Sequence, residues 1–300
     1  MLTIELNHVR KCYDQFVAVN DLSFSIEKGG VFGLLGPNGA GKTSTIRMMI
    51  GITVPDSGQI TLFSRPFERK SLHKVGYLPE ERGLYKKMKI LDQLVFLGEL
   101  HGMTNGAAKQ KAVEWSKRLE IDAWLQKKVE ELSKGMQQKI QFIAALLHDP
   151  DFIIMDEPFF GLDPVNATLL KDVMLDLKKQ GKTILFSTHR MDQVEKLCDN
   201  ICLINQGKAV LQGDLKTIKA GYGKRNVQIE YEGNGDFLQR NPLVSAYNNY
   251  GNYVEVRLAE GADAQQLLRV VAERSRVNKF EVMEPSLEEI FINMVGKNDA

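Results

Sequence analysis

Apolar and polar residues alternate along the first part of the chain, which is the pattern of half-buried strands. The alternation is clear in residues 3–13 and 17–26, and shorter apolar stretches follow at 31–36, 58–63 and 74–80. The sequence EKGG separates the second stretch from the third and has the composition of a turn. The first 80 residues are therefore predicted to form strands and turns, except for a glycine-rich loop and a helical segment at 42–51, which follow the stretch 31–36.

Between Ile90 and Leu147 the apolar residues recur every three to four positions, which is the period of a helix. The last of these helices is expected to start at Ser133, whose hydroxyl can cap the free backbone amides, and to turn one apolar face inward. We therefore expect a helical block over about 82–150.

Three apolar runs come later, at 151–158, 182–190 and 201–210. Each has apolar residues at successive positions, as in strands of a parallel sheet that is covered on both faces. The pattern predicts three strand-to-helix alternations, so that the helical block interrupts an α/β core.

The pattern changes again near residues 215–224, which have the composition of a linker. Half-exposed strands and amphipathic helices follow, without a group of residues typical of catalysis. We expect two domains, an α/β domain over 1–217 and a small α+β domain over 218–300.

Composition and charge limit the classes of partner that the chain is expected to bind. The chain has 39 basic and 38 acidic residues, so its net charge of +1 gives no attraction for nucleic acid, and none is expected as a partner. No apolar run reaches the roughly 20 residues of a membrane-spanning helix, and the start of the chain does not resemble a signal peptide. Cys12, Cys198 and Cys202 lack the CxxC spacing, which fits buried thiols in a reducing cytoplasm.

A glycine-rich stretch between an apolar run and a helical pattern matches the P-loop motif GxxxxGK[ST]. Glycines let backbone amides converge on phosphate oxygens at the start of a helix, where the helix dipole favours anions. Lys42 is expected to reach the β- and γ-phosphates, and the Thr43 hydroxyl to bind Mg²⁺. The predicted nucleotide-binding residues of this loop are Gly36, Pro37, Asn38, Gly39, Ala40, Gly41, Lys42, Thr43 and Ser44.

Asp156 and Glu157 stand at the end of the apolar run 151–158. A carboxylate at the C-terminal end of a buried strand is placed to hold the Mg²⁺ of a bound nucleotide. Its neighbour can act as the base that activates water. Successive strand residues face opposite ways, so the two carboxylates can cooperate only if the strand ends there, as Pro158 suggests.

Together, these motifs identify a family. In their order and spacing, the sequence resembles the ATP-binding subunit of an ABC transporter over residues 2–215, with an ABC ATPase version of the P-loop NTPase fold. The motifs are the P-loop, LSKGM at 132–136, IIMDEP at 153–158, GLDP at 161–164 and STH at 187–189.

The resemblance implies further roles for single residues. Tyr13 matches the aromatic residue that stacks on adenine, although it could equally pack in the core. Ser133 and Gly135 match the signature residues that bind the γ-phosphate held by another monomer. Asp163 matches a residue that crosses the dimer interface, and His189 the histidine that contacts the γ-phosphate. Lys42 would neutralise phosphate charge while Glu157 and His189 orient the attacking water.

Three residues depart from the family pattern. Glu80 stands where the family has a glutamine, and its carboxylate can still bind Mg²⁺ or orient water. Lys134 replaces a glycine of the signature, and Phe160 replaces a small hydroxyl residue. These departures leave the class unchanged and bear on the rate of hydrolysis.

The resemblance also implies partners. Two such subunits, as a homodimer or a heterodimer with a paralogue, bind two ATP molecules between them on the cytoplasmic face of a membrane permease. The segments 78–85 and 284–296 resemble subunits that export drugs, antibiotics or sodium. Leu84, Tyr85 and Met88 could line a groove for the permease or belong to the local core.

Two other functions are alternatives to export. One is a soluble ABC protein that acts on ribosomes or DNA, and the other is a regulator that binds ATP with little hydrolysis.

Overall fold

The computed structural model describes residues 1–81, 83–222, 226–233 and 235–295, and the chain divides into two units. Unit 1 comprises Met1–Gly213 and unit 2 comprises Asp214–Ala300. The segment at 215–224, which has the composition of a linker, therefore begins unit 2. Its part Leu215–Tyr222 forms helix α7, and residues 223 and 224 lie outside the described residues.

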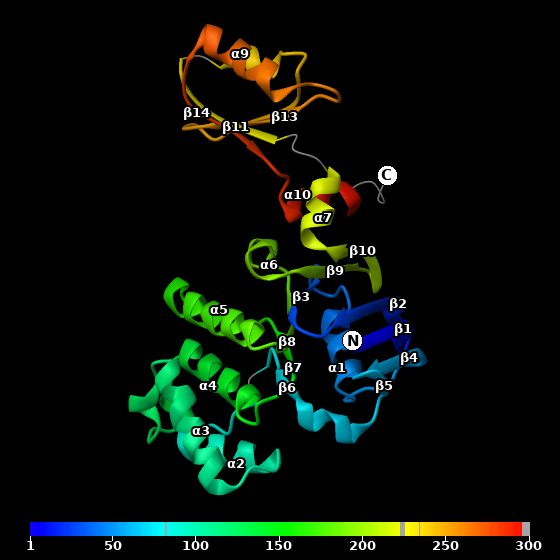
Figure 1. Cartoon of the computed structure of the whole chain (residues 1–300), viewed down its shortest axis with the longest axis vertical. Coiled ribbons are helices and arrows are strands. Elements are labelled where there is room, and N and C mark those ends of the chain that lie inside the picture. The colour runs from blue at the N-terminus through cyan, green and yellow to red at the C-terminus, as the bar shows by residue number, and fades with distance from the viewer. Residues whose placement is uncertain (82, 223–225, 234, 296–300) are drawn as a thin grey trace. The chain divides into compact units, whose positions relative to one another are not determined.

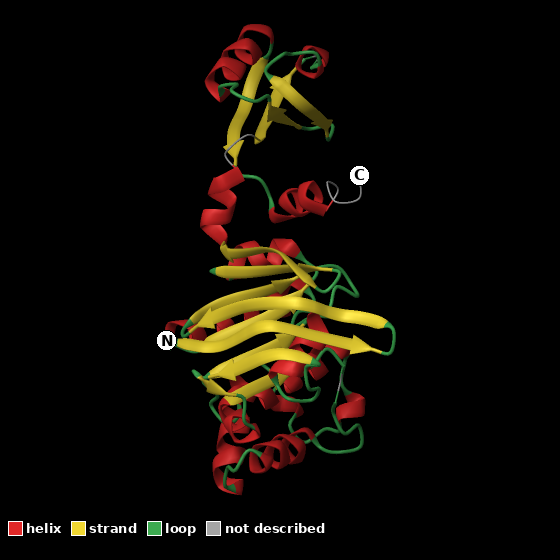
Figure 2. Cartoon of the chain, turned by 90° about the vertical axis from the view of Figure 1, so that its right-hand side faces the viewer, coloured by secondary structure: helices red, strands yellow, loops and turns green. Residues whose placement is uncertain are grey.

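Unit 1 begins with a four-stranded antiparallel sheet, in which the two long strands at the N-terminus form a hairpin (Figure 2). Its strands lie in the order β2-β1-β4-β5. The predicted alternation is confirmed, because Ile4 and Leu6 are buried while Glu5 and Asn7 are not. The strands are β1 (Leu2–Tyr13), β2 (Phe16–Glu27), β4 (Ser57–Leu62) and β5 (Arg65–Pro66).

A six-stranded sheet follows in the order β10-β9-β3-β8-β7-β6, and β6, β7, β8, β3 and β9 run parallel. Every residue of β7 and β8 is buried, as the continuous apolar runs predicted. The strands are β3 (Gly30–Leu35), β6 (Val75–Leu78), β7 (Phe152–Asp156), β8 (Thr183–Thr188), β9 (Asn200–Asn205) and β10 (Lys208–Asp214).

The prediction that a helix follows the strand in the third apolar run, 201–210, was wrong. β9 and β10 are joined by Gln206 and Gly207, which both have positive φ angles of 49° and 76°. Two such residues form the tight turn of a β-hairpin, so the run after β9 turns back as a strand.

Helices α2, α3 and α4 pack together as a lobe beside the six-stranded sheet, which confirms the helical block (Figure 1). As expected, the Ser133 hydroxyl caps α4 by accepting a hydrogen bond from the Met136 amide at 3.3 Å. The helices of unit 1 are α1 (Lys42–Met49), α2 (Ile90–Leu100), α3 (Asn105–Arg118), α4 (Lys134–Leu146), α5 (Pro164–Lys179) and α6 (Met191–Leu197), with 3₁₀ turns η1 (Arg69–Lys74), η2 (Asp122–Trp124) and η3 (Val129–Glu131).

The main core lies between the two sheets and includes one side of α1. Phe24 of β2 and Phe32 of β3 stack across it with ring centroids 5.4 Å apart. Burial of each large apolar side chain stabilises the fold by about 1.5–3 kcal/mol. This core fixes α1, and with it the glycine-rich loop, at the C-terminal ends of the parallel strands.

Unit 2 contains a four-stranded antiparallel sheet in the order β12-β13-β11-β14. Helices α8 and α9 pack on one face of it through Leu238, Leu267 and Val271. The chain order β-α-β-β-α-β with this strand order is the ferredoxin-like arrangement. The elements are β11 (Asn226–Glu232), α8 (Asp236–Gln239), β12 (Val244–Asn249), β13 (Val254–Leu258), α9 (Ala264–Arg274), β14 (Arg276–Met283) and α10 (Leu287–Val295).

In the part of the chain that the structure describes, no helix has the length and apolar character needed to cross a membrane.

Candidate functional site

The glycine-rich loop joins β3 to α1 and depends on glycine at two positions. Gly36 has a φ of 150° and Gly41 a φ of 107°, which side-chain-bearing residues rarely adopt. A Cβ atom at Gly36 would lie 2.2 Å from the Ile204 carbonyl oxygen, and one at Gly41 would lie 2.3 Å from that of Ala18. The loop is therefore packed against two strands, with its amides at the N-terminus of α1, where the helix dipole attracts an anion.

Lys42 is held within this loop. Its Nζ donates hydrogen bonds to the carbonyl oxygens of Gly36 at 2.8 Å and Pro37 at 3.1 Å. Burial lowers the pKa of Lys42, and the nearby carboxylates of Glu157 and Asp156 oppose that shift. The ammonium thus sits between an anion-attracting loop and a set of carboxylates.

A cleft of about 370 Å³ opens beside the loop. The loop forms one side and three carboxylates from β6, β7 and the residues after them form another. The lining residues are Phe16, Ala18, Asn38, Gly39, Ala40, Gly41, Lys42, Thr43, Ser44, Glu80, Asp156 and Glu157. Most of the nucleotide-binding, metal-binding and catalytic residues expected from the sequence therefore lie together.

Asp156 is a buried carboxylate with one unpartnered oxygen. It is 1% exposed, and one of its carboxylate oxygens accepts a hydrogen bond from the Ser187 hydroxyl. Its other oxygen, Oδ2, is buried with no hydrogen-bond partner. A buried, unpartnered carboxylate oxygen is costly unless a cation or donor reaches it. Together with the Thr43 hydroxyl and Glu80, it offers the oxygen ligands that Mg²⁺ prefers.

Glu157 lies just beyond the end of β7 with a φ of 48°, so the backbone turns there and both carboxylates can face the cleft. Its Oε1 accepts hydrogen bonds from the His189 backbone amide at 3.0 Å and from His189 Nδ1 at 2.7 Å. Its Oε2 accepts one from the Thr188 hydroxyl at 3.0 Å. Three donors at the end of β8 therefore fix the orientation of this carboxylate.

Glu80 shares the cleft with two other carboxylates. Burial raises the pKa of Glu80, and the charges of Asp156 and Glu157 raise it further. Glu80, which stands where the family has a glutamine, is therefore a carboxylate whose negative charge is disfavoured by its neighbours. A bound cation would offset this repulsion.

Ser133, Gly135 and Asp163 lie outside this cleft. Ser133 is exposed at the start of α4. Gly135 lies against the loop before α5, because a Cβ atom added to Gly135 would be 3.6 Å from the Gly161 carbonyl oxygen. Asp163 caps α5 by accepting a hydrogen bond from the Asn166 amide at 3.0 Å, which lowers the pKa of Asp163. The exposed signature residues do not meet the cleft of their own chain.

An aromatic residue that was not predicted lines the cleft near Tyr13. Phe16 lines the cleft, whereas Tyr13 does not; Tyr13 is 40% exposed, with the Lys11 ammonium 5.7 Å from its ring centre. Sequence reasoning missed Phe16 because its approach to the cleft depends on hairpin register, in which Phe16 pairs with Tyr13. The core alternative for Tyr13 is therefore wrong.

The family models agree with the geometry. The model described as "ABC transporter" matches residues 19–160. A second model, "ATP-binding protein DrrA1-3-like, C-terminal domain", matches residues 213–295.

Individual proteins are similar along nearly the whole chain. The "Uncharacterized ABC transporter ATP-binding protein YhaQ" of Bacillus subtilis (strain 168) is 47% identical over 296 residues, 99% of each chain. The "Nod factor export ATP-binding protein I" of Rhizobium sp. (strain N33) is 32% identical over 304 residues, 99% of this chain and 98% of the relative. A solved "ATP binding subunit of ABC transporter" superposes with a TM-score of 0.68 at 28% identity, over 74% of this chain and 93% of the other.

Proposed function

Because this chain belongs to the ATP-binding subunits of ABC transporters, whose ATP hydrolysis is coupled to transport, we propose that it powers export through a separate membrane permease. One observation carries the catalytic part of this proposal. Glu157 is oriented by His189 and Thr188 beside the unpartnered Asp156 oxygen and opposite the P-loop.

The P-loop supplies the binding energy for the phosphates. The backbone N–H groups of this loop, apart from Pro37, which has none, would surround them, and Lys42 would exchange the carbonyl oxygens that hold it for phosphate oxygens. The adenine lies toward the β1–β2 hairpin, where Tyr13 and Phe16 form a cross-strand pair. That Tyr13 stacks on the base stays a prediction.

Thr43, Asp156 and Glu80 are the residues that would hold Mg²⁺. Mg²⁺ held there would supply positive charge to offset the negative charge that develops in phosphoryl transfer. The support from this chain is the buried Oδ2 of Asp156 and the crowding of three carboxylates in one cleft.

Glu157 positions the attacking water and accepts its proton. Because His189 Nδ1 donates to Glu157, the other ring nitrogen can donate to a γ-phosphate oxygen only when both ring nitrogens carry a proton. The protein thus contributes mostly orientation and electrostatic stabilisation to the reaction.

Completion of the site requires a second subunit. Ser133 and Gly135 present the N-terminus of α4 to solvent, where it can bind the γ-phosphate of another copy. Asp163 and the 61% exposed Phe160 belong to the loop that would lie at the same interface. Lys134 is exposed, which favours its position in solvent. A homodimer or a pair with a paralogue satisfies this arrangement.

The permease is proposed to dock on a groove of about 360 Å³ beside α2 and α4, which would place the subunit on the cytoplasmic face of the membrane. Leu84 lines this groove, while Tyr85 and Met88 form a neighbouring apolar surface with Phe96. Tyr85 is 56% exposed, so this segment is available to a partner. Export, as the direction of transport, is supported by the C-terminal domain match and by the printed name of the Nod factor relative.

The test is the Glu157→Gln substitution. We expect unchanged Mg·ATP binding, measured with a fluorescent nucleotide, and at least a hundredfold lower steady-state ATPase activity than the parent. Because Gln keeps the size of the side chain but cannot accept a proton, only the chemical step should fail. Parent-like turnover in this variant would remove Glu157 from its role, and a parent that binds ATP without hydrolysing it would favour a regulatory protein.

A further inference from the structure

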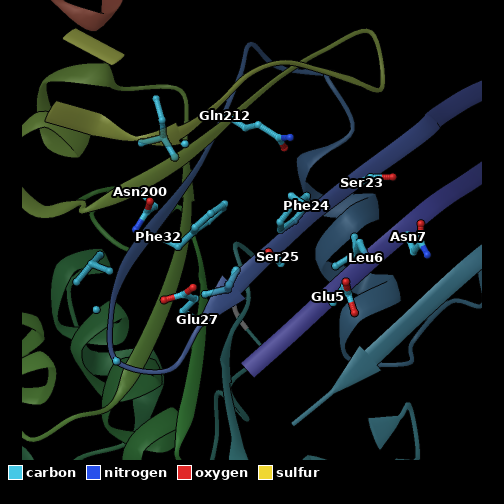
Figure 3. A pocket seen from close by; sticks show the side chains of 16 residues that line it. Glu5, Leu6, Asn7, Ser23, Phe24, Ser25, Glu27, Phe32, Asn200 and Gln212 are labelled. Atoms are coloured by element: carbon cyan, nitrogen blue, oxygen red, sulfur yellow. The ribbon is translucent and has the colours of Figure 1, made fainter. Parts of the chain in front are cut away.

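A groove of about 730 Å³ lies in unit 1, away from the nucleotide cleft (Figure 3). It runs between the four-stranded sheet and the β9–β10 hairpin. Polar side chains form much of its lining, including Glu5 and Glu27, and the nearly buried Phe24 and Phe32 rings form an apolar part of its wall. The residues assigned to ATP, Mg²⁺ or the permease do not contribute to it.

Two strand edges border this groove. β2 is an edge strand of its sheet and β10 is an edge strand of the other. They are joined at one end, where the Asn20 amide donates to the Gly207 carbonyl oxygen at 2.8 Å. Beyond this junction, the consecutive residues 23–27 of β2 line the groove, as do Gln212 and Gly213 of β10. Consecutive lining residues come from both faces of β2, so the strand presents its edge, which can pair with another strand.

The charged side chains that line the groove are all negative. Its lining contains two carboxylates and no lysine, arginine or histidine. Glu5 pairs with Ser25, two residues before Glu27 on the same face, so the carboxylates are diagonal neighbours about 7–8 Å apart. Neither forms an ion pair with another residue of the described ranges. Cationic side chains would meet no competing cation in this lining.

We propose that this groove binds an extended peptide segment with lysine or arginine at alternate positions, which adds to the edge of β2 as a further strand. Side chains two residues apart in a strand lie on one face about 6.6–6.8 Å apart. One cation would therefore lie beside Glu27 on β2, and the next would reach across Ser25 toward Glu5 on β1. An apolar residue between the cations would point to the opposite face, toward Phe24 and Phe32. Backbone hydrogen bonds provide affinity and the alternating side chains provide selectivity.

The source that fits this chemistry is a cytoplasmic segment of the permease, and this part of the inference rests on the proposed function. Cytoplasmic segments of membrane proteins carry an excess of lysine and arginine. Such a segment would tether the permease at a site distinct from the groove beside α2 and α4.

The test uses a fluorescein-labelled hexapeptide with lysine and valine at alternate positions and blocked ends, titrated with the full chain and followed by fluorescence anisotropy. Glu5→Gln and Glu27→Gln should each weaken binding about threefold, and the double variant about tenfold, with a smaller effect of salt than in the parent. Glu114→Gln removes an exposed carboxylate on α3 and serves as the matched control, with unchanged affinity.

Two further peptides separate strand addition from simple attraction. The same peptide with alternate backbone amides methylated keeps its charge but loses donors, and should bind at least tenfold more weakly. The glutamate counterpart should not bind. Equal binding of the methylated peptide, or parent affinity in the double glutamine variant, would overturn the inference. Mg·ATP affinity, measured on the same samples, tests the proposed function separately, because the groove and the cleft share no residue.

Discussion

At the scale of single residues, the site depends on backbone conformations that few side chains allow. Gly36 and Gly41 turn the loop toward the phosphates, and Glu157 adopts a positive φ so that it can enter the cleft beside Asp156. Motif spacing was enough to select this loop and both carboxylates, which line one cleft, and their roles stay predictions. It could not predict that Thr188 and His189 together hold Glu157, because that contact joins two strands through tertiary structure.

The two glycines of the loop allow a matched comparison. Gly41→Ala places a Cβ atom 2.3 Å from the Ala18 carbonyl oxygen, whereas Gly39→Ala meets nothing within 4 Å, although both have positive φ. The unfavourable backbone conformation alone costs about 1–2 kcal/mol. We expect Gly39→Ala to lower the free energy of unfolding by about that amount and Gly41→Ala to lower it by more, with loss of ATP binding. Chemical denaturation and nucleotide titration check this; equal effects of the two substitutions would show that the packing of Gly41 is unimportant.

At the scale of elements, the sequence was most informative where one pattern runs for many residues. The buried strands β7 and β8 and the capped helix α4 followed from apolar runs and from Ser133. The hairpin of β9 and β10 was missed, although Gln206-Gly207 has the composition of a tight turn.

A stacked histidine pair connects the end of α2 with the residue after the C-cap of α4. The rings of His101 and His148 lie 3.8 Å apart and nearly parallel, and His148 Nε2 donates to the Val75 carbonyl oxygen at 3.1 Å. Burial, with a contribution from the charge of His101, lowers the pKa of His148 from 6.5 to about 4. The folded chain therefore keeps this ring neutral at pH values where the unfolded chain protonates it.

This shift predicts a loss of stability in acid. The contribution of neutral His148 is fully present above pH 6.5 and is lost as the pH falls toward about 4, because the unfolded state takes up the proton first. The melting temperature of the parent should therefore fall between pH 7 and pH 5, and that of His148→Gln should fall less. His73→Gln removes an exposed histidine whose charge makes the smallest of the contributions to the lowered pKa of His148, so its melting temperature should fall nearly as much as that of the parent. If the melting temperatures of the parent and of His148→Gln fell by the same amount between pH 7 and pH 5, the lowered pKa of His148 would be contradicted.

At the scale of the whole molecule, one chain supplies a P-loop cleft and an exposed signature helix, but its own signature does not meet its own cleft. This is the reason for proposing that two subunits face each other head to tail around two nucleotides. Sequence reasoning anticipated this from the single occurrence of each motif. It described the C-terminal part only as α+β, because strand order depends on pairing between distant strands and gave no local signal.

The most direct test of the account is the mass of the Glu157→Gln variant in solution with Mg·ATP, measured by light scattering. Because ATP cannot be consumed, it should hold two chains together, at twice the 33.8 kDa of one chain. Adding Ser133→Arg, at the exposed start of α4, should return the mass to that of one chain while each chain still binds ATP. A single-chain mass for Glu157→Gln with saturating Mg·ATP, or a two-chain mass that survives Ser133→Arg, would contradict the shared nucleotide site.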